Sequence, residues 1–442
     1  MSPTFTHARN VPGSCPMTTA HATALATAPH TAGTTAVAVI APQPGSGHAD
    51  ALARRGRDAV AVTLGLGTRP PAYKDTTPDE TYTAVIEYAG DLRRTIKKLR
   101  TLGVEAVVAA SPAGVELAER IAWQLRLPGS GMPGSVHLRT DRGVQTEALS
   151  RAGIAVPRTL RTTSFVEALA WADCHPASAY RLASAAIGVT AGPTECPTKQ
   201  SIAAVWPQIQ GAAFHQSGNA ALVLRERVAG RQYVVDSVTR LGPDGPQHAV
   251  TGIWAHAHAP TGLLDRIDLL HRHDLLARRL SLYVCRALDT LGVTSGALSC
   301  HVAFEPEHGP IMLSAGVVTN RSRADEAIWE IAGHDPIDAA LDGACCASRH
   351  SSDIPRCRVA RIYVNAPRGG APESAVLQAL AVLPTAVCID TNPSSFIART
   401  APLLPGGKAC EIVLADEMPG AIERDYQRIR VLMADLHKIR HM

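Results

Sequence analysis

From residue 36, short apolar runs alternate with polar, helix-like segments. The runs AVAVI (36–40) and DAVAVTLGL (58–66) are typical of buried strands, and HADALARRG between them is typical of a helix. A helix is predicted from about Thr81 to Leu102, followed by a strand at VEAVVAAS (104–111) and a second helix. Strands that alternate with helices in this way predict a small, doubly wound parallel α/β domain.

Beyond the turn-rich segment PGSGMPGS (128–135), the order of elements becomes irregular. SFVEALAWAD predicts a helix with Ser164 as its N-cap, and strands are predicted from Leu222 onward. Residues 263–292 predict one long helix, and residues 297–318 predict a hairpin that turns near Gly309. Two further strands, RVARIYVNAP and CEIVLAD, and a terminal helix from about Pro419 complete the pattern.

Composition narrows the class of protein. The chain has 442 residues, of which 46% are apolar and 19% charged, as in ordinary globular proteins. A net charge of +4 and the lack of long basic runs argue against nucleic acid as a partner, and no apolar run is long enough to span a membrane. The N-terminus has no signal-like pattern and the ten cysteines show no CxxC spacing, which predicts reduced thiols and a cytoplasmic location.

Three segments, in this order, resemble the ATP-grasp superfamily: AGVELAERIAWQLRLPG, then QYVVDSVTR followed by VTGIW, and finally ERDYQRIRVLMADL. More closely, the chain resembles carboxylate–amine ligases that make dipeptides and amino-acid amides in natural-product pathways. The resemblance implies an α/β and α+β protein with an ATP-grasp fold preceded by a parallel α/β domain. The expected parts are a disordered tail (1–34), the N-terminal or pre-ATP-grasp domain (35–135), the ATP-grasp lobes (136–345) and a C-terminal α+β segment that completes them (346–442).

The resemblance also implies where the nucleotide would bind. LRTDRG places Arg142 at the position of a phosphate-binding lysine, and AYRLASAAIGV places Tyr180 at a second one, with Arg181 beside it. The loop that closes over phosphates has Ala186 in place of a glycine, which restricts its backbone. In RERVAGRQY the hinge residues Glu226 and Val228 are kept, while Gln232 stands where an acid would bind the ribose. The expected lining of the cleft is Arg142, Tyr180, Arg181, Glu226, Gln232, His301 and Ser314.

The expected metal positions lack carboxylates. Where the superfamily has two acids and an asparagine, the hairpin carries His301, Ser314 and Gly316, and Val318 stands at the usual arginine position. Arg321 follows three residues later, so His301 and Arg321 are the candidate catalytic residues. A zinc site formed by His256, His258 and His301 is an alternative, but ordinary core or solvated histidines are favoured because no fourth ligand is evident.

Two functions of different class follow. The favoured one is a pseudoenzyme or repurposed accessory protein of a natural-product pathway, with no cofactor and with an amino-acid-like or anionic ligand, a partner protein or a second copy of the chain as partner. The alternative is an ATP-dependent carboxylate–amine ligase that uses ATP and Mg²⁺ and forms an acylphosphate. Chemistry without ATP in the same cleft is a third reading.

Overall fold

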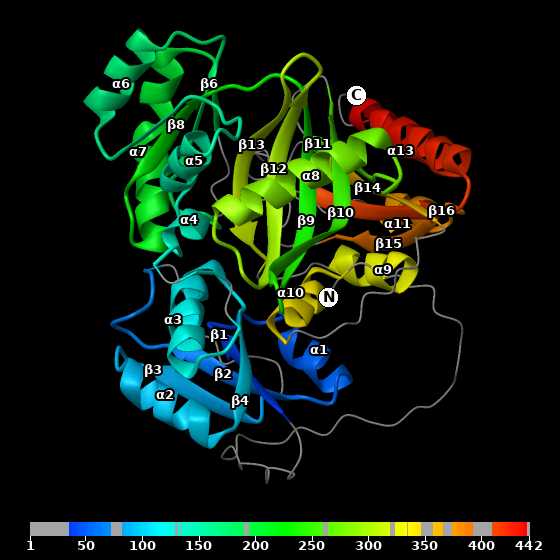
Figure 1. Ribbon diagram of the computed structural model, residues 1–442. Coiled ribbons are helices and arrows are strands. Elements are labelled where there is room, and N and C mark those ends of the chain that lie inside the picture. The colour runs from blue at the N-terminus through cyan, green and yellow to red at the C-terminus, as the bar shows by residue number, and fades with distance from the viewer. Residues whose placement is uncertain are drawn as a thin grey trace, which may run out of the picture.

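The computed structural model describes residues 35–71, 82–128, 131–132, 134–189, 194–259, 264–318, 323–333, 335–345, 357–365, 374–391 and 409–439. The predicted disordered tail (1–34) and the candidate Arg321 lie outside these residues. The described strands form three sheets, each with helices packed against it (Figure 1).

The N-terminal sheet is parallel and has the strand order β3-β2-β1-β4. Its elements are β1 (Ala36–Ile40), α1 (His48–Arg54), β2 (Asp58–Leu64), β3 (Ala84–Tyr88), α2 (Leu92–Thr101), β4 (Val104–Ala109), the 3₁₀ turn η1 (Pro112–Gly114) and α3 (Val115–Leu125). This confirms the predicted parallel α/β region, in which β1 is central and fully buried. The helix predicted from Thr81 is wrong in its first part. Residues 84–88 pair with β2, and the helix begins only after Asp91, whose side chain caps it.

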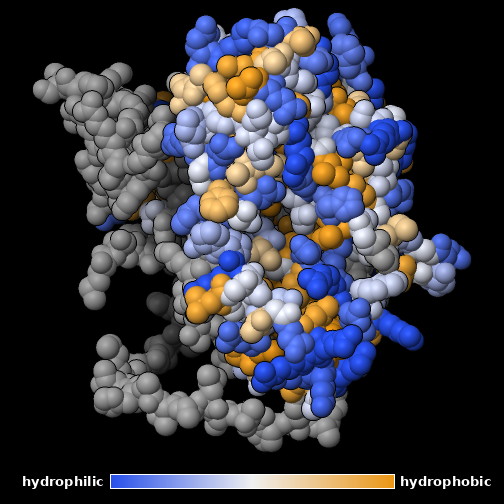
Figure 2. All heavy atoms as spheres, turned by 90° about the vertical axis from the view of Figure 1, so that its left-hand side faces the viewer, coloured by the Kyte–Doolittle hydropathy of each residue, from blue (hydrophilic) through white to orange (hydrophobic). Residues whose placement is uncertain are grey.

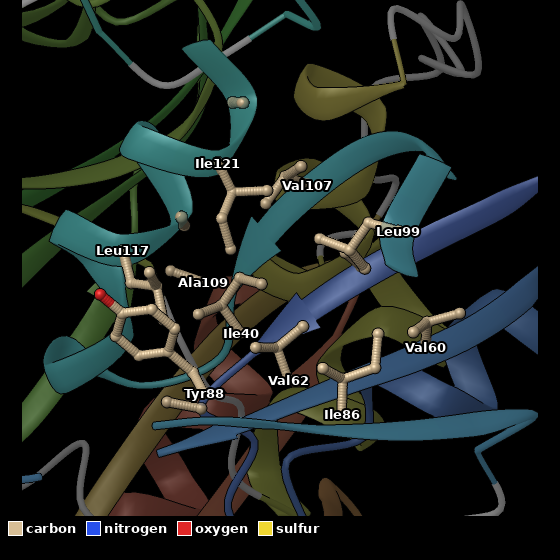
Figure 3. Close-up of a cluster of buried hydrophobic side chains, with 14 of the residues drawn as sticks. Ile40, Val60, Val62, Ile86, Tyr88, Leu99, Val107, Ala109, Leu117 and Ile121 are labelled. Atoms are coloured by element: carbon tan, nitrogen blue, oxygen red, sulfur yellow. The ribbon is translucent and has the colours of Figure 1, made fainter. Parts of the chain in front are cut away.

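Apolar side chains cover both faces of this sheet. On one face Leu117 and Ile121 of α3 pack toward Ile40 and Val62 (Figure 3). The other face is covered by α1 and by α10 (Pro336–Ala344), which arrives from much later in the chain. Arg55 joins these two helices through ion pairs to Asp338 and Asp342 at 2.9 and 2.7 Å. The N-terminal domain is therefore fastened to the rest of the molecule.

A small lobe follows, built on the antiparallel strand order β5-β8-β6-β7. Its elements are α4 (His137–Thr140), α5 (Arg142–Arg151), β5 (Thr159–Thr162), α6 (Phe165–Cys174), β6 (Tyr180–Ser184), β7 (Thr194–Cys196), α7 (Lys199–Ser217) and β8 (Leu222–Glu226). The Ser164 hydroxyl accepts a bond from the Glu167 amide, which confirms the predicted N-cap of α6. Helices α6 and α7 bury one face of the sheet, and the other face turns toward the large sheet.

The large sheet has the strand order β13-β12-β9-β10-β11-β14-β16-β15. Its elements are β9 (Arg231–Gly242), β10 (Gly245–His258), β11 (Leu264–Leu269), α8 (Leu275–Thr290), β12 (Gly296–Glu305), β13 (Gly309–Val317), α9 (Arg323–Ala332), β14 (Arg358–Asn365), α11 (Ser374–Ala381), β15 (Ala386–Asp390), β16 (Ala409–Asp416) and α13 (Pro419–Ile439). The predicted hairpin is confirmed, with Gly309 in the left-handed region at φ 81°. The single helix predicted over 263–292 is wrong, because its first residues form β11 between β10 and β14.

The exterior is mixed in character. On the face that Figure 2 shows, polar side chains are interspersed with small apolar groups. Within the described residues, none of the helices combines the length and the apolar character needed to cross a membrane.

Candidate functional site

A cleft of about 640 Å³, open to solvent, lies where the three parts of the molecule meet. The N-terminal domain contributes Pro112 and Val115, and the segment leading into α5 contributes Arg139, Thr140 and Arg142. The loop after β6 adds residues 187–189, and the hairpin β12–β13 adds Ser299, His301, Ser314, Gly316 and Val317. Four positions that the sequence assigned to nucleotide or metal binding, Arg142, His301, Ser314 and Gly316, thus come together.

The floor of this cleft consists of every second residue along the strands, because alternate side chains point to the same face of a sheet. His301 pairs with Ser314, and Ser299 pairs with Gly316, so all four face the same side. The residues between them, such as Cys300 and Ala315, point to the opposite side and pack against α8. The floor is thus held in place by an apolar core directly beneath it.

Asp236 on β9 is a floor residue that the sequence reasoning missed. It pairs with Ser299, so its carboxylate lies on the cleft side of the sheet. There it accepts hydrogen bonds from the indole nitrogen of Trp254 at 2.9 Å and from the Ser299 hydroxyl. The sequence contained a signal for this placement. Asp236 is four residues from Gln232 in the same strand, so the two side chains share one face.

The floor does not fit a pair of Mg²⁺ ions. Magnesium prefers oxygen ligands, chiefly carboxylates, in octahedral geometry. His301 offers an imidazole, Ser314 a hydroxyl and Gly316 no side chain at all. The carboxylate of Asp236 is a single acid, and both of its oxygens already accept hydrogen bonds, from Trp254 and Ser299. Among the residues that the structure describes, no group of three His, Cys, Asp or Glu side chains is arranged to hold a metal ion.

Arg142 holds the loop that follows β6. Its side chain donates to the carbonyl oxygens of Ser184 at 2.9 Å and Ala186 at 2.5 Å, and its backbone amide donates to Ala185. Burial lowers the pKa of the Arg142 guanidinium to about 10. The Arg142 side chain is therefore anchored to the loop at the edge of the cleft.

The loop itself uses its backbone amides internally. Ala185 donates to Ala221, Ile187 donates to Thr140, and the Ala186 amide donates to the Ser184 hydroxyl. Gly188 lies at φ 87°, where an added Cβ would approach Pro112 to 2.3 Å. The amides of residues 185–187 therefore point to other parts of the chain and not toward a phosphate in the cleft.

Tyr180 does not line the cleft, which corrects the expectation from the sequence. Its hydroxyl donates within the small lobe, where the carbonyls of Ala172 and His175 both lie at 2.9 Å, and its ring is buried against α6 and α7. Because side chains alternate along β6, the next residue, Arg181, takes the opposite face. The side chain of this pair that points toward the large sheet is therefore that of Arg181.

Arg181 meets an amide where an acid was expected. With its oxygen turned toward the guanidinium, Gln232 accepts from both terminal nitrogens of Arg181 at 3.3 Å. The nearest ion pair of Arg181, to Glu195, is long at 3.8 Å, and Glu195 also pairs with Arg227 at 3.3 Å. Burial lowers the pKa of Arg181. Gln232 therefore contacts this cation without neutralising it.

Arg225 on β8 is a second residue that sequence reasoning missed. It is the cross-strand partner of Arg181 and is only 8% exposed. One terminal nitrogen donates to the carbonyl of Leu313 on β13 at 2.7 Å, which joins the small lobe to the large sheet. Burial, together with the positive charges of Arg181 and Arg142, lowers the pKa of Arg225 to about 9. Three arginines therefore form a basic wall between the small lobe and the large sheet, and of these three Arg142 is the one that lines the cleft, whereas Arg181 does not.

The predicted hinge lies between β8 and β9, beside this wall. Glu226 accepts from the backbone and the side chain of Arg158 at 2.9 and 2.7 Å, so its carboxylate is already paired. Val228 is half-buried in the turn. Gly230 lies at φ 93°, and a Cβ there would approach the Phe304 carbonyl oxygen to 2.4 Å. The roles of Glu226 and Val228 in nucleotide binding remain predictions.

The histidines adjoin the same sheet face. His256 is 2% exposed, and its ring lies 6.2 Å from that of His258. Burial, followed by the nearby His301 and His258, lowers the pKa of His256 well below its ordinary value. A neutral imidazole is common to core histidines and to zinc ligands, so this pKa does not decide between them. Among the described residues no set of three His, Cys, Asp or Glu side chains is placed to hold a metal ion, and the core interpretation stays the favoured prediction.

No protein-family model and no curated protein matches the sequence. Solved structures match in fold. The L-amino acid ligase from Bacillus licheniformis gives a TM-score of 0.64 at 12% identity, over 90% of this chain and 97% of that one. A carboxyaminoimidazole ribonucleotide synthase from Aspergillus clavatus, in complex with ATP, gives 0.64 at 12% identity, over 91% and 99%. The biotin carboxylase domain of the Hydrogenobacter thermophilus 2-oxoglutarate carboxylase, in complex with MgADP, gives 0.56 at 15% identity, over 88% of each chain.

These similarities confirm the predicted fold class and the resemblance to the ATP-grasp superfamily. The chain has an ATP-grasp fold with a parallel α/β domain before it. At such low identity the likeness extends to the fold, and the activity has to be argued from the cleft.

Proposed function

We propose that this protein binds an anionic small molecule in the cleft between its lobes and does not catalyse Mg-ATP-dependent ligation. The observation that carries the proposal is the charge of the site. Arg142, Arg181 and Arg225 form a basic wall between the lobes, and of these three Arg142 lines the cleft. The floor row of His301, Ser314 and Gly316 supplies no carboxylate, and the carboxylate of Asp236 beside it already accepts from Trp254 and Ser299. Such a cleft attracts anions directly, without a metal ion as a bridge.

The loop after β6 supports the same proposal. Phosphate-binding loops act through free backbone amides. Here the amides of residues 185–187 are engaged within the protein, and Arg142 fixes the loop from the side. A ligand is therefore expected to be held by side-chain cations more than by the loop.

Calorimetry tests this proposal without knowledge of the ligand. ATP, ADP, pyrophosphate and amino-acid-like carboxylates are titrated into the full chain, once with EDTA and once with Mg²⁺. We expect at least one anion to bind with EDTA present, and Mg²⁺ not to tighten that binding, because the floor offers no site to share the metal with a ligand. For ATP, ADP and pyrophosphate, which chelate Mg²⁺ themselves, Mg²⁺ should weaken binding. Failure of every anion to bind under both conditions would overturn the proposal.

The second candidate is an ATP-dependent carboxylate–amine ligase. It is favoured by the shared fold with an L-amino acid ligase and with a synthase solved in complex with ATP. It requires ATP binding that depends on Mg²⁺ and release of ADP when amino-acid pairs are supplied. A coupled ADP assay over amino-acid pairs decides between the two, and turnover above the background without enzyme would establish the ligase. The likeness to natural-product ligases makes amino acids and their amides the first compounds to test.

A further inference from the structure

Arg225 is a buried cation that no acid among the described residues pairs with. It is 8% exposed, and its one bond within the described residues goes to a neutral carbonyl, that of Leu313. The charges that act on it come from Arg181 and Arg142, and both are positive. A buried charge is normally paired, because removing it from water is costly.

The alternation of the small-lobe strands fixes where Arg225 points. On β6 and β8, Tyr180, Leu182 and Leu224 face α6 and α7. Arg181 and Arg225 form a cross-strand pair on the opposite face, toward β13 and the cleft. The two arginines are therefore cross-strand neighbours on this face, close enough for the charge of Arg181 to lower the pKa of Arg225.

Nearby acids are already engaged elsewhere. Glu195 is shared between Arg181 and Arg227, and Asp141 pairs with Arg161 at 2.9 Å. Gln232 contacts Arg181 with a neutral amide. The pair of guanidinium forks thus keeps a positive charge that matches an oxyanion, which such forks can bind through two parallel hydrogen bonds.

We propose that Arg225 and Arg181 form a metal-independent oxyanion subsite between the small lobe and β13, beside the part of the cleft that Arg142 lines, and that this subsite takes a phosphate or carboxylate group of the ligand. This inference rests on the proposed binding of an anion and adds the place and the residues. It assigns a ligand-binding role to Arg225, the first residue of the hinge segment RERVAGRQY, to which the sequence resemblance gave no role. Because Arg225 also bonds to β13, an anion here is held at the junction of the two lobes.

The test compares Arg225→Met with a matched variant, Arg151→Met. Arg151 lies on α5 with 74% of its side chain exposed, so its loss changes the net charge equally without touching the cleft. Titrations of the full chain in EDTA use pyrophosphate and ADP as phosphate probes, glutarate as a carboxylate probe and adenosine as a neutral control. We expect R225M to weaken the preferred anion at least about tenfold, as lost charge-assisted bonds do, and R151M to leave its affinity within about twofold. The probe class that suffers the loss identifies the source of the oxyanion.

Thermal unfolding separates this role from a purely structural one. Saturating anion should raise the Tm of the wild type and of R151M, but not that of R225M. Arg225→Lys, which keeps the charge and loses the fork, should fall between the two. If the wild type binds an anion and R225M binds it equally well, the subsite is wrong while the proposed function stands. If the wild type binds none of the probes, both proposals fail.

Discussion

Two buried arginines in this protein are surrounded by charges of opposite sign. Arg361 on β14 is 1% exposed and donates to Glu411 at 2.5 Å and to Asp325 at 2.9 Å. Those acids hold the pKa of Arg361 well above its ordinary value, although burial alone lowers it. Arg225 has two arginines for neighbours, and its pKa is lowered to about 9. Among the described residues, acids therefore pair with one buried cation and not with the other.

The two arginines differ in their partners because they lie in different parts of the fold. Arg361 sits inside the C-terminal half of the large sheet, where α9 supplies Asp325 and β16 supplies Glu411. It also lies over the ring of Trp254, which bonds to Asp236 in the cleft floor. Arg225 lies at the junction of the lobes, near Arg142, which lines the cleft. A buried cation paired within its own chain indicates a structural role, whereas an unpaired one at a cleft indicates a binding role.

The largest expected effect comes from removing the paired cation. Arg361→Met leaves Glu411 and Asp325 buried together without their counter-ion. We expect the free energy of unfolding to fall by about 3–5 kcal/mol, measured by urea denaturation monitored with circular dichroism.

Arg225→Met is the matched change at the other site. It removes a buried charge that has no acid partner together with one hydrogen bond, so the two effects offset and the stability should stay within about 1 kcal/mol of the wild type. If Arg225→Met lowered the free energy of unfolding as much as Arg361→Met does, the two arginines would not differ in their structural roles.

A smaller effect is expected from neutralising the acid beside Arg361. Burial raises the pKa of Glu411 above its ordinary 4.5. Between that value and the raised one, the folded protein keeps a proton that the unfolded chain has lost. Wild-type stability should therefore fall as the pH rises through this interval, by at most about 1.4 kcal/mol per pH unit.

Glu411→Gln cannot titrate and should lack that slope. Urea denaturation at a series of pH values from 4 upward measures it, with Glu330→Gln on the exposed side of α9 as the control. Parallel stability curves for the wild type and E411Q would show that Glu411 stays ionised in the folded protein.

Gln232→Glu places an acid beside Arg181, so that Arg181 would be paired as Arg361 is. The new carboxylate would lie about where the amide oxygen accepts from Arg181, at 3.3 Å. Affinity for the anion should drop by about tenfold, or roughly 1.4 kcal/mol, because the acid competes with the ligand. Calorimetry measures it, and Gln247→Glu on an exposed stretch of β10 serves as the charge-matched control. Unchanged affinity in Q232E would remove Arg181 from the ligand site.

The smallest effect concerns Tyr180. Tyr180→Phe removes the hydroxyl that bonds inside the small lobe and should cost about 1 kcal/mol of stability. Because this side chain points away from the cleft, anion affinity should not change. A clear loss of affinity at unchanged stability would place Tyr180 at the ligand after all.

The sequence by itself determined the elements whose signals are local. The buried run of β1, the cap at Ser164 and the turn at Gly309 depend on neighbouring residues, and all three were predicted. Tertiary pairing decided the rest. Residues 84–88 and 264–269 became strands because β2, β10 and β14 offered them partners, and a sequence pattern does not show such distant partners.

The same division holds for the cleft. Motif order sufficed to bring Arg142, His301, Ser314 and Gly316 together. Helices α6 and α7 cover one face of the small sheet, and Tyr180 lies on that face. Arg181 therefore takes the other face. A register shift of one residue would exchange the two, and the sequence pattern does not fix that register. Arg225 begins the hinge segment RERVAGRQY, but the motif gave it no role, and its importance lies in the absence of an acid around it among the described residues. Only the tertiary structure decides that, because burial and charge pairing are properties of the folded surroundings and not of the residue.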